Sequence, residues 1–346
     1  MTTLACPVPA TARDTILLGH GSGGRMTADL IATTFLPALS NPLLDALGDS
    51  AVLRLGSVRL AFTTDSFVVS PRRFPGGDLG SLAVHGTVND LAVSGAQPLA
   101  LAAAFILEEG FPLAELRALV ASMRDAARAA GVPVATADTK VVEHGKGDGL
   151  YVTTSGIGIV PEGVELAPAR MRSGDAILVS GPIGDHGIAV LSVREGLAFE
   201  GDVASDSAPL HGLVADLLAS GAAVRCMRDP TRGGVATVLN ELARAGGVGL
   251  AIEERAVPVR ASVRAACEVL GLDPLYVACE GRLLAVVAEA DGARALAALQ
   301  AHPLGTGAAR IGSVVPPGGP PVTLTTLFGT ARALDVLTGA QLPRIC

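Results

Sequence analysis

Residues 98–140 read PLALAAAFILEEGFPLAELRALVASMRDAARAAGVPVATADTK, and this stretch contains a strand, a helix and a second strand. The apolar run Leu99–Leu107 has the length of a buried strand. Pro112–Ala130 carries apolar residues at helical spacing, with a proline in its first turn and Gly131 at its end, as helices favour. Val132–Thr136 then predicts the next strand. Strands that alternate with helices are typical of an α/β fold.

The alternation of strands and helices continues on both sides of this stretch. We predict further strands at 51–55, 58–63 and 151–160, and the second half of the chain starts the alternation again. Its strands are predicted at 175–180, 283–287 and 309–314, and its helices at 188–194, 207–219, 235–245, 263–270 and 292–301. We therefore predict a mixed α/β (α+β) fold with two α/β domains. The predicted parts are an N-terminal segment with a Gly-rich loop (1–40), a first domain (41–160), a linker (161–172), a second domain (173–316) and a flexible tail ending in Cys346 (317–346).

The composition argues against several classes of function. The formal net charge is −7 and aromatic residues make up 3 %, so the chain offers neither a basic surface nor a stacking platform for nucleic acid. Its longest apolar run, Pro98–Leu107, is about half of a membrane span, and no signal-peptide pattern is visible. No CxxC pair suggests zinc or disulfides, which fits a reducing compartment. We expect a cytoplasmic protein that binds neither nucleic acid nor membranes. Its cysteines are Cys6, Cys226, Cys267, Cys279 and Cys346.

A Gly-rich loop, Gly19–Gly24, follows a predicted strand at Thr15–Leu18 and precedes a predicted helix, Met26–Leu36, that stops at Pro37. Backbone N–H groups at the start of a helix attract phosphate. The loop formally satisfies GxGxxG, but no well-placed acidic residue follows about 20 positions later, and the ending of a P-loop is absent. A phosphate loop of another kind and a simple flexible turn both remain open.

Five aspartates stand at the predicted ends of strands and helices: Asp49, Asp65, Asp90, Asp138 and Asp229. Carboxylates beside Gly, Thr or Asn suit Mg²⁺, which binds a few carboxylates together with phosphate oxygens and water. Each aspartate alone could equally be a cap or a turn residue. The histidines never occur at zinc-ligand spacing. The sequence thus favours an ATP–Mg²⁺ site in which phosphoryl transfer depends on positioning and charge stabilisation.

Two further features extend this nucleotide site. The turn Arg228–Gly234 precedes a helix and could bind an anion or a metal. Lys140 is one of two lysines in a chain that otherwise uses arginine, which suggests that a compact point charge is needed there. The residues expected to bind the nucleotide are His20, Gly21, Gly23, Gly24, Asp65, Asn89, Thr139, Arg232 and Gly233.

These motifs closely resemble those of the hydrogenase maturation HypE family, the carbamoyl dehydratases. The resemblance covers essentially the whole chain. The wider superfamily includes aminoimidazole ribonucleotide synthetase, selenophosphate synthetase and thiamine-monophosphate kinase, from which the terminal PRIC distinguishes the HypE family. The matching stretches are HGSGG (20–24), DSFVVSPRRFPGGDLG (65–80), GTVNDLAVSGA (86–96), ADTKVV (137–142), GDHG (184–187), RDPTRGG (228–234), DPLYVACEG (273–281) and PRIC (343–346).

The resemblance implies a homodimer whose first domain serves in ATP binding and dimerisation. It also implies that a carbamoyltransferase, HypF, loads a carbamoyl group onto Cys346, and that ATP-dependent dehydration converts this group to a thiocyanate. The cyano group would then pass to iron on a HypC–HypD complex, for a nickel–iron hydrogenase. Carried over to this sequence, Cys346 is the carrier thiol, Glu280 the candidate base and Lys140 a group that orients the amide or stabilises charge. Asp90 and its companion aspartates would hold Mg²⁺.

Two positions depart from the family pattern, since Cys279 stands where asparagine is usual and Ala137 where glycine is usual. We expect Ala137 to have little effect unless its backbone needs a positive φ. Two other functions remain as alternatives. Another ATP-using enzyme of the superfamily would have no use for Cys346, and an ATP-gated carrier would hold the group without dehydrating it.

Overall fold

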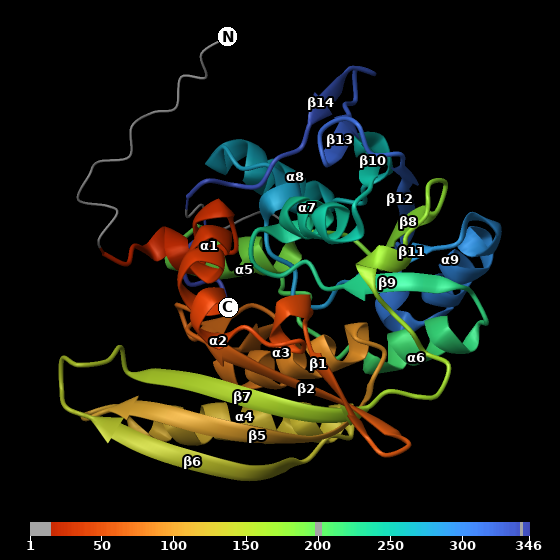
Figure 1. The fold of residues 1–346 in the computed structure, drawn as a ribbon. Helices are drawn as coiled ribbons and strands as arrows, with labels where there is room; N and C mark the ends of the chain where they lie inside the picture. Colours follow the sequence, from red (N-terminus) through yellow and green to blue (C-terminus); the bar gives the residue numbers. More distant parts are fainter. Residues whose placement is uncertain (1–14, 198–202, 340–341) are drawn as a thin grey trace.

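Two β-sheets organise the computed structural model, which describes residues 15–197, 203–339 and 342–346 (Figure 1). Part of the predicted N-terminal segment, residues 1–14 with Cys6, lies outside the described residues. Each sheet is packed against helices, which confirms the predicted mixed α/β class. No helix in the described ranges is long and apolar enough to cross a membrane.

The first sheet has five strands in the order β1-β2-β7-β5-β6 and is antiparallel except for the β5–β6 pair. Helices α3 and α4 cover one of its faces, with Leu82, Leu101 and Leu119 in the core between them. The strands are β1 (Ala51–Leu55), β2 (Val58–Phe67), β7 (Leu150–Ile159), β5 (Gln97–Glu108) and β6 (Val134–Val142), and the helices are α3 (Leu79–Val93) and α4 (Leu113–Ala130).

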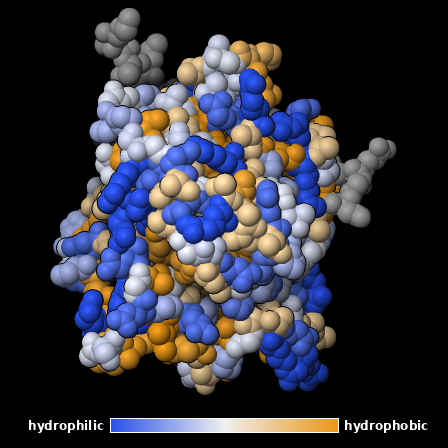
Figure 2. Space-filling view, turned by 90° about the vertical axis from the view of Figure 1, so that its right-hand side faces the viewer, coloured by the Kyte–Doolittle hydropathy of each residue, from blue (hydrophilic) through white to orange (hydrophobic). Residues whose placement is uncertain are grey.

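The second sheet has seven strands in the order β14-β13-β10-β12-β8-β11-β9. Helix α7 packs on one face and helices α6 and α9 on the other. Around α6 and α9, hydrophilic and hydrophobic residues are interspersed on the surface (Figure 2). The strands are β8 (Ala176–Val179), β9 (Val224–Arg228), β10 (Gly249–Glu253), β11 (Leu284–Val287), β12 (Ala309–Val315), β13 (Val322–Thr325) and β14 (Ala331–Ala333), and the helices are α5 (Asp185–Arg194), α6 (His211–Ala219), α7 (Gly234–Gly246), α8 (Ala261–Leu270) and α9 (Gly292–Ala301).

The flexible tail was predicted to begin at residue 317, but part of this stretch belongs to the second sheet. Residues 322–325 and 331–333 are strands of the second sheet, in which β13 pairs with β10 and β14 with β13. Glycines and prolines before β13 made this stretch resemble a linker, although a parallel neighbour provides its backbone partners. We use "tail" below only for residues 342–346. Ala340 and Gln341, which belong to the predicted flexible tail, lie outside the described residues.

The N-terminal segment also differs from the prediction. Residues 18–21 form a 3₁₀ turn rather than the end of a strand. Helical structure runs from Arg25 to Leu39 as α1 (Arg25–Leu30), a π-helical turn and α2 (Leu36–Leu39). Pro37 does not end it, because proline is tolerated in the first turn of a new helical piece, where its missing N–H needs no partner.

Helices α3 and α4 approach each other closely at one glycine. The start of α3 is fixed by Asp78, whose side chain accepts a hydrogen bond from the Ser81 N–H. A Cβ at Gly80 would overlap the Leu119 carbonyl oxygen of α4. The distance between the two helices therefore requires glycine at position 80.

We predict that Gly80→Ala destabilises the protein by about 1–3 kcal/mol, because the helices must separate to accommodate a methyl group. Gly212→Ala on α6 is the matched control, since its added Cβ would lie 3.3 Å from the end of the His302 side chain. Urea unfolding of both variants measures the difference. Equal stability of Gly80→Ala and the control would show that the helix contact is not tight.

Candidate functional site between the two domains

Three aspartates from separate parts of the chain converge between the sheets. Carboxylate oxygens of Asp49, Asp90 and Asp229 lie within 4.8 Å of one another. Asp49 precedes β1, Asp90 is on α3, and Asp229 follows β9, so the second domain completes a group begun by the first. Thr63 of β2 donates a hydrogen bond of 2.9 Å to Asp90 Oδ2.

Burial dominates the electrostatics of this acidic cluster. It raises the pKa of Asp49, against the lowering effect of Arg228, whose Nε lies 3.0 Å from Asp49 Oδ1. The pKa of Asp90 lies well above its usual value because of burial and then the charges of Asp229 and Asp49. Burial, with the Asp49 charge, raises the pKa of Asp229 to about 8. Because the three carboxylates, one buried and two partly buried, repel one another, the cluster favours a bound cation, and its hard oxygen donors fit Mg²⁺.

Asp65 lies beside this cluster and is not one of the three converging aspartates. It stands within β2 rather than after it, because the strand is longer than predicted. Burial raises its pKa, and the positive charge of Arg232 opposes this shift. Asp65 therefore shares the electrostatic environment of Arg232.

The Gly-rich loop packs against the turn that carries Arg232. The Arg232 guanidinium donates a hydrogen bond of 3.3 Å to the Gly21 carbonyl. A Cβ at Gly23 would lie 2.7 Å from the Arg232 carbonyl oxygen, and one at Gly24 would overlap that of Leu337. The close contact with the second domain thus explains these two glycines. Phosphate binding by His20, Gly21, Gly23 and Gly24 stays a prediction, as does nucleotide binding by Gly233, which caps α7 with a φ of 77°.

The thiol of Cys346 lies in the same interior as the acidic groups (Figure 1 shows the C-terminus between the two sheets). Cys346 is 8 % exposed, and Glu280 is 2 % exposed. Burial raises the pKa of the thiol, while Arg232 lowers it and Glu280 raises it further. The structure therefore brings the predicted carrier thiol, the predicted base and Arg232 together.

Glu280 is a buried carboxyl with an unused hydrogen-bonding atom. Its Oε1 has no hydrogen-bond partner within the described part of the chain. Burial raises its pKa well above the usual value, followed by the charges of Asp229 and Asp65. Its backbone is fixed on both sides, since its N–H donates to Asp206 Oδ1 at 3.1 Å and its carbonyl accepts from Asn89 Nδ2 at 3.1 Å.

Asn89 joins the domains in this structure. Its Nδ2 also donates to the Ala208 carbonyl at 3.0 Å, and its Oδ1 accepts from the Leu210 N–H at 2.7 Å. Both amide hydrogens are therefore engaged in holding Glu280 and the start of α6. The nucleotide-binding role assigned to Asn89 from the sequence stays a prediction.

Asp138, Thr139 and Lys140 lie on β6, away from the acidic cluster of the same chain. The strand order places β6 three strands from β2, a separation of about 14 Å. Lys140 Nζ pairs with Asp138 Oδ2 at 2.8 Å, and their side chains are 70 % and 67 % exposed. Both residues stand within the strand, not after it as predicted. Their metal-binding and catalytic roles, and that of Thr139, cannot come from this position without a further chain.

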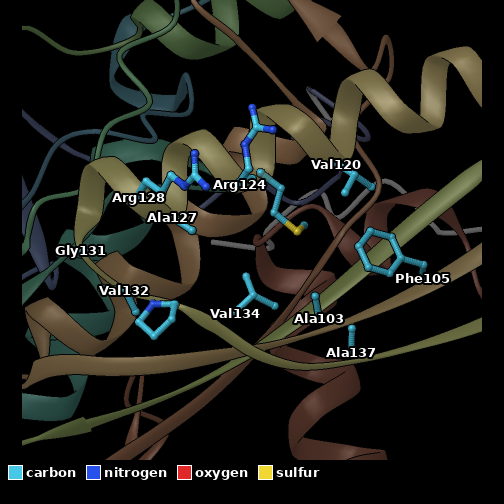
Figure 3. A pocket seen from close by; sticks show the side chains of 12 residues that line it. Ala103, Phe105, Val120, Arg124, Ala127, Arg128, Gly131, Val132, Val134 and Ala137 are labelled. Carbon is cyan, nitrogen blue, oxygen red and sulfur yellow. The ribbon is translucent and has the colours of Figure 1, made fainter.

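A separate groove of about 530 Å³ lies between α4 and the strands β5 and β6 (Figure 3). Phe105, Met123 and Val134 give it an apolar lining. The side chains of Arg124 and Arg128 extend from α4 away from the strands. The groove contains none of the residues predicted for catalysis.

The two departures from the family pattern are both accommodated. Cys279 is fully buried, and its sulfur accepts a hydrogen bond from the Gly184 N–H at 3.2 Å. Ala137 stands in β6, and it is not among the described non-glycine residues with positive φ. An alanine is therefore unstrained there.

Sequence reasoning missed three residues of this region, Thr63, His186 and Arg194, and it named Arg228 only as part of a candidate anion or metal turn. Arg228 and His186 lie inside motifs quoted above, but nothing in the motifs shows their partners. Arg228 pairs with Asp49 and Glu241, and His186 contacts the tail. Their partners are distant in sequence, so only the fold reveals these contacts.

Comparison with known proteins assigns both halves of the chain. Residues 47–160 match the N-terminal domain of AIR synthase related proteins, and residues 172–324 match the C-terminal domain of the same proteins. The carbamoyl dehydratase HypE of Azotobacter vinelandii is 58 % identical over 327 residues, which are 94 % of this chain and 96 % of that protein.

Solved structures agree with this assignment. A HypE–HypF complex contains a chain that is 46 % identical, with a TM-score of 0.85, over 89 % of this chain and 99 % of that one. A HypE structure in complex with ATP is 48 % identical, with a TM-score of 0.81, over 96 % of this chain and all of that one. The chain therefore belongs to the HypE family of carbamoyl dehydratases, which serve hydrogenase maturation, within the AIR synthase related superfamily.

Proposed function

We propose that this chain uses ATP to dehydrate a carbamoyl group carried on its own Cys346, and that the resulting thiocyanate supplies a cyanide ligand for a nickel–iron hydrogenase. The observation that carries the proposal is the burial of the Cys346 thiol at a place where the charges of Arg232, Glu280 and the aspartates act on it. A structural cysteine would not need two ionisable neighbours in a buried site.

The reaction needs an activated oxygen and a base. The oxygen of a thiocarboxamide is a poor leaving group, so its attack on the γ-phosphorus of ATP forms an O–P bond and releases ADP. The C–O bond then breaks to release phosphate as the C≡N bond forms, and the two N–H protons leave the nitrogen, one to a side chain of the protein and the other to the departing phosphate. Glu280 is the side chain that we assign as proton acceptor, because its Oε1 is buried and unpartnered beside the thiol.

We place ATP and Mg²⁺ between the Gly-rich loop and the acidic cluster. The ATP complex of the HypE relative supports nucleotide binding here. Asp49, Asp90 and Asp229 would hold Mg²⁺, with Asp65 nearby, and the ion would neutralise phosphate charge. Arg232 would face the transferred phosphoryl group, since the charges of Asp65 and of the Cys346 thiol both act on its guanidinium and raise its pKa.

The partners follow from the chemistry of the carried group. The HypE–HypF complex of a relative supports a carbamoyltransferase HypF as the enzyme that loads Cys346. We infer that a HypC–HypD complex then takes the cyano group onto iron. Loading and delivery both require the thiol to leave the interior, so the tail must move during each cycle.

We further propose a homodimer formed through the uncovered face of the first sheet, here called the outer face. The face opposite α3 and α4 presents exposed apolar side chains, which a soluble monomer would rarely leave in contact with water. Lys140 of β6 lies beside Ile106 of β5 in the sheet register, and Asp138 lies beside Ala104, so both charged residues belong to the same face as Ile106. A second copy packed on the outer face would therefore receive the partner's Lys140. The exposed apolar residues are Leu53, Leu55, Val58, Phe62, Ile106, Ile157 and Ile159.

The dehydration predicts two successive mass changes. Incubation with the carbamoyltransferase, carbamoyl phosphate and ATP should add one carbamoyl group to Cys346, and fresh ATP–Mg²⁺ should then remove one water, as measured by intact mass. Glu280→Gln should load normally but lose water about 10²–10⁴-fold more slowly. The exposed Glu289→Gln is the control. Normal dehydration by Glu280→Gln would remove the base role, and loading without water loss in the unmodified protein would indicate a carrier.

The acidic cluster predicts a metal effect without substrate. Mg²⁺ should raise the melting temperature of the unmodified protein, because it relieves repulsion among the carboxylates. Asp90→Asn should melt higher without metal and lose most of the Mg²⁺ shift, since one repelling charge is gone. Asp216→Asn on the surface of α6 is the control, and differential scanning calorimetry measures all three. An unchanged Mg²⁺ shift in Asp90→Asn would place the metal elsewhere.

The dimer predicts complementation between two inactive variants. If Lys140 acts across the outer face, a heterodimer of Lys140→Ala with Glu280→Gln contains one complete site and should show about half of the normal dehydration rate. Each homodimeric variant should be strongly impaired. Differently tagged chains allow the heterodimer to be purified before the assay. A heterodimer as inactive as both parents would show that Lys140 serves its own chain, and a normal rate in the Lys140→Ala homodimer would show that Lys140 has no role.

A further inference from the structure

The tail is held in the interior by main-chain hydrogen bonds. On one side it pairs with residues 68–70 after β2, where the Val68 N–H donates to the Cys346 carbonyl at 3.0 Å and the Ser70 N–H to the Arg344 carbonyl at 3.2 Å. The Arg344 side chain reaches back to the Val68 carbonyl at 2.9 Å and forms an ion pair with Asp148. The first domain thus receives the tail in the manner of an added strand.

Arg194, at the C-terminal end of α5, holds the other side of the tail. Its Nη1 donates to the Pro343 carbonyl at 2.7 Å and its Nη2 to the Arg344 carbonyl at 2.8 Å. Its Nε donates to the Ser70 carbonyl at 2.8 Å. One guanidinium therefore joins the second domain, the tail and the first domain, and hydrogen bonds from a charged donor are about twice as strong as neutral ones.

His186, at the other end of α5, holds the next carbonyl. Its Nε2 lies 2.8 Å from the Ile345 carbonyl oxygen and its Nδ1 lies 2.8 Å from Ser205 Oγ. Because a carbonyl can only accept, Nε2 carries the proton and Nδ1 accepts from the Ser205 hydroxyl. Phe74 packs edge-on against the fully buried ring, with centroids 5.2 Å apart. The imidazole is therefore oriented before the tail arrives.

The inserted tail also contains an unfavourable backbone conformation. Arg344 has a φ of 53°, in the left-handed region, which is unfavourable for a residue with a Cβ. The carbonyl of this residue is held by both Arg194 and the Ser70 N–H. The hydrogen bonds of α5 therefore oppose a local tendency of the tail to leave.

We propose that Arg194 and His186 are positioning residues, which hold the tail by its main-chain carbonyls and place the Cys346 thiol beside Glu280. Neither side chain reaches the reacting atoms. Arg194 sets how much of the time the tail is inserted, and His186 fixes the last peptide group before the thiol. The catalytic part of this inference rests on the proposed dehydration, whereas the part that concerns tail insertion does not.

Insertion can be measured through the reactivity of Cys346. Arg194→Gln should increase the rate of alkylation of Cys346 by iodoacetamide at least tenfold, quantified on the peptide that contains it. Arg310→Gln, which removes an exposed arginine paired with Glu289, is the control and should match the unmodified protein. The alkylation rate of Arg194→Lys should lie between those of Arg194→Gln and the unmodified protein, because one ammonium group cannot bind all three carbonyls. An alkylation rate for Arg194→Gln equal to that of the control would overturn the proposal.

A pair of substitutions tests His186 without relying on one fold-sensitive variant. Gln can place its amide N–H near the position of Nε2, so His186→Gln should keep alkylation within about threefold of normal. His186→Phe fills the space but cannot donate, and should resemble Arg194→Gln. Circular dichroism and melting temperature exclude general unfolding. Equal alkylation rates in His186→Phe and His186→Gln would remove His186 from the proposal.

Single-turnover dehydration of the preloaded protein completes the test. Arg194→Gln should accept the carbamoyl group at a normal or higher rate, dehydrate it at least tenfold more slowly and keep its apparent affinity for ATP. A fall in dehydration matched by an equal loss of ATP affinity would indicate general damage to the site. Fast alkylation of Cys346 in Arg194→Gln, together with no dehydration even by the unmodified protein, would refute the proposed function. The inference that Arg194 keeps the tail inserted would still stand.

Discussion

Buried negative charge between the domains is the constraint on which the rest of this structure depends. Asp49 and Asp90 come from the first domain, and Asp229 and Glu280 from the second. Burial raises the pKa of each of these four carboxyl groups. The site therefore exists only in the assembled chain, and its repulsion must be offset by arginines, a cation and packing around it.

Packing and hydrogen bonds on both sides of the site supply that offset. Asn89 connects α3 to the backbone of Glu280 and to the start of α6. The tail adds a third component, since Ile345 and Cys346 belong to the same hydrophobic core as Phe67 and Val69. The carrier thiol is thus part of the interior that it enters, and insertion and domain docking stabilise each other.

Much of the architecture followed from local patterns. The unit at 98–140 and the helices α7 and α9 have clear periodicity. The wrong predictions share one cause: each of these features depends on residues that are distant in the sequence. Asp65 and Lys140 were placed after strands because polar residues resemble an ending, yet neighbouring strands extend the ladder through them. The partners of Asn89 are 119 and 191 positions away, so no local signal could reveal its contacts.

Because the tail is bound through its main-chain carbonyl groups, the number of residues in the tail determines where the Cys346 thiol lies. Arg194 and His186 donate hydrogen bonds to main-chain carbonyl groups, which every residue type has. The number of residues between Pro343 and Cys346 therefore decides how far the thiol extends into the site. One additional residue in between would displace the sulfur by about 3.3 Å, more than the tolerance of a proton transfer. The main-chain hydrogen bonds therefore constrain the number of residues from Pro343 to Cys346, in addition to the contacts that the side chains of Arg344 and Ile345 make.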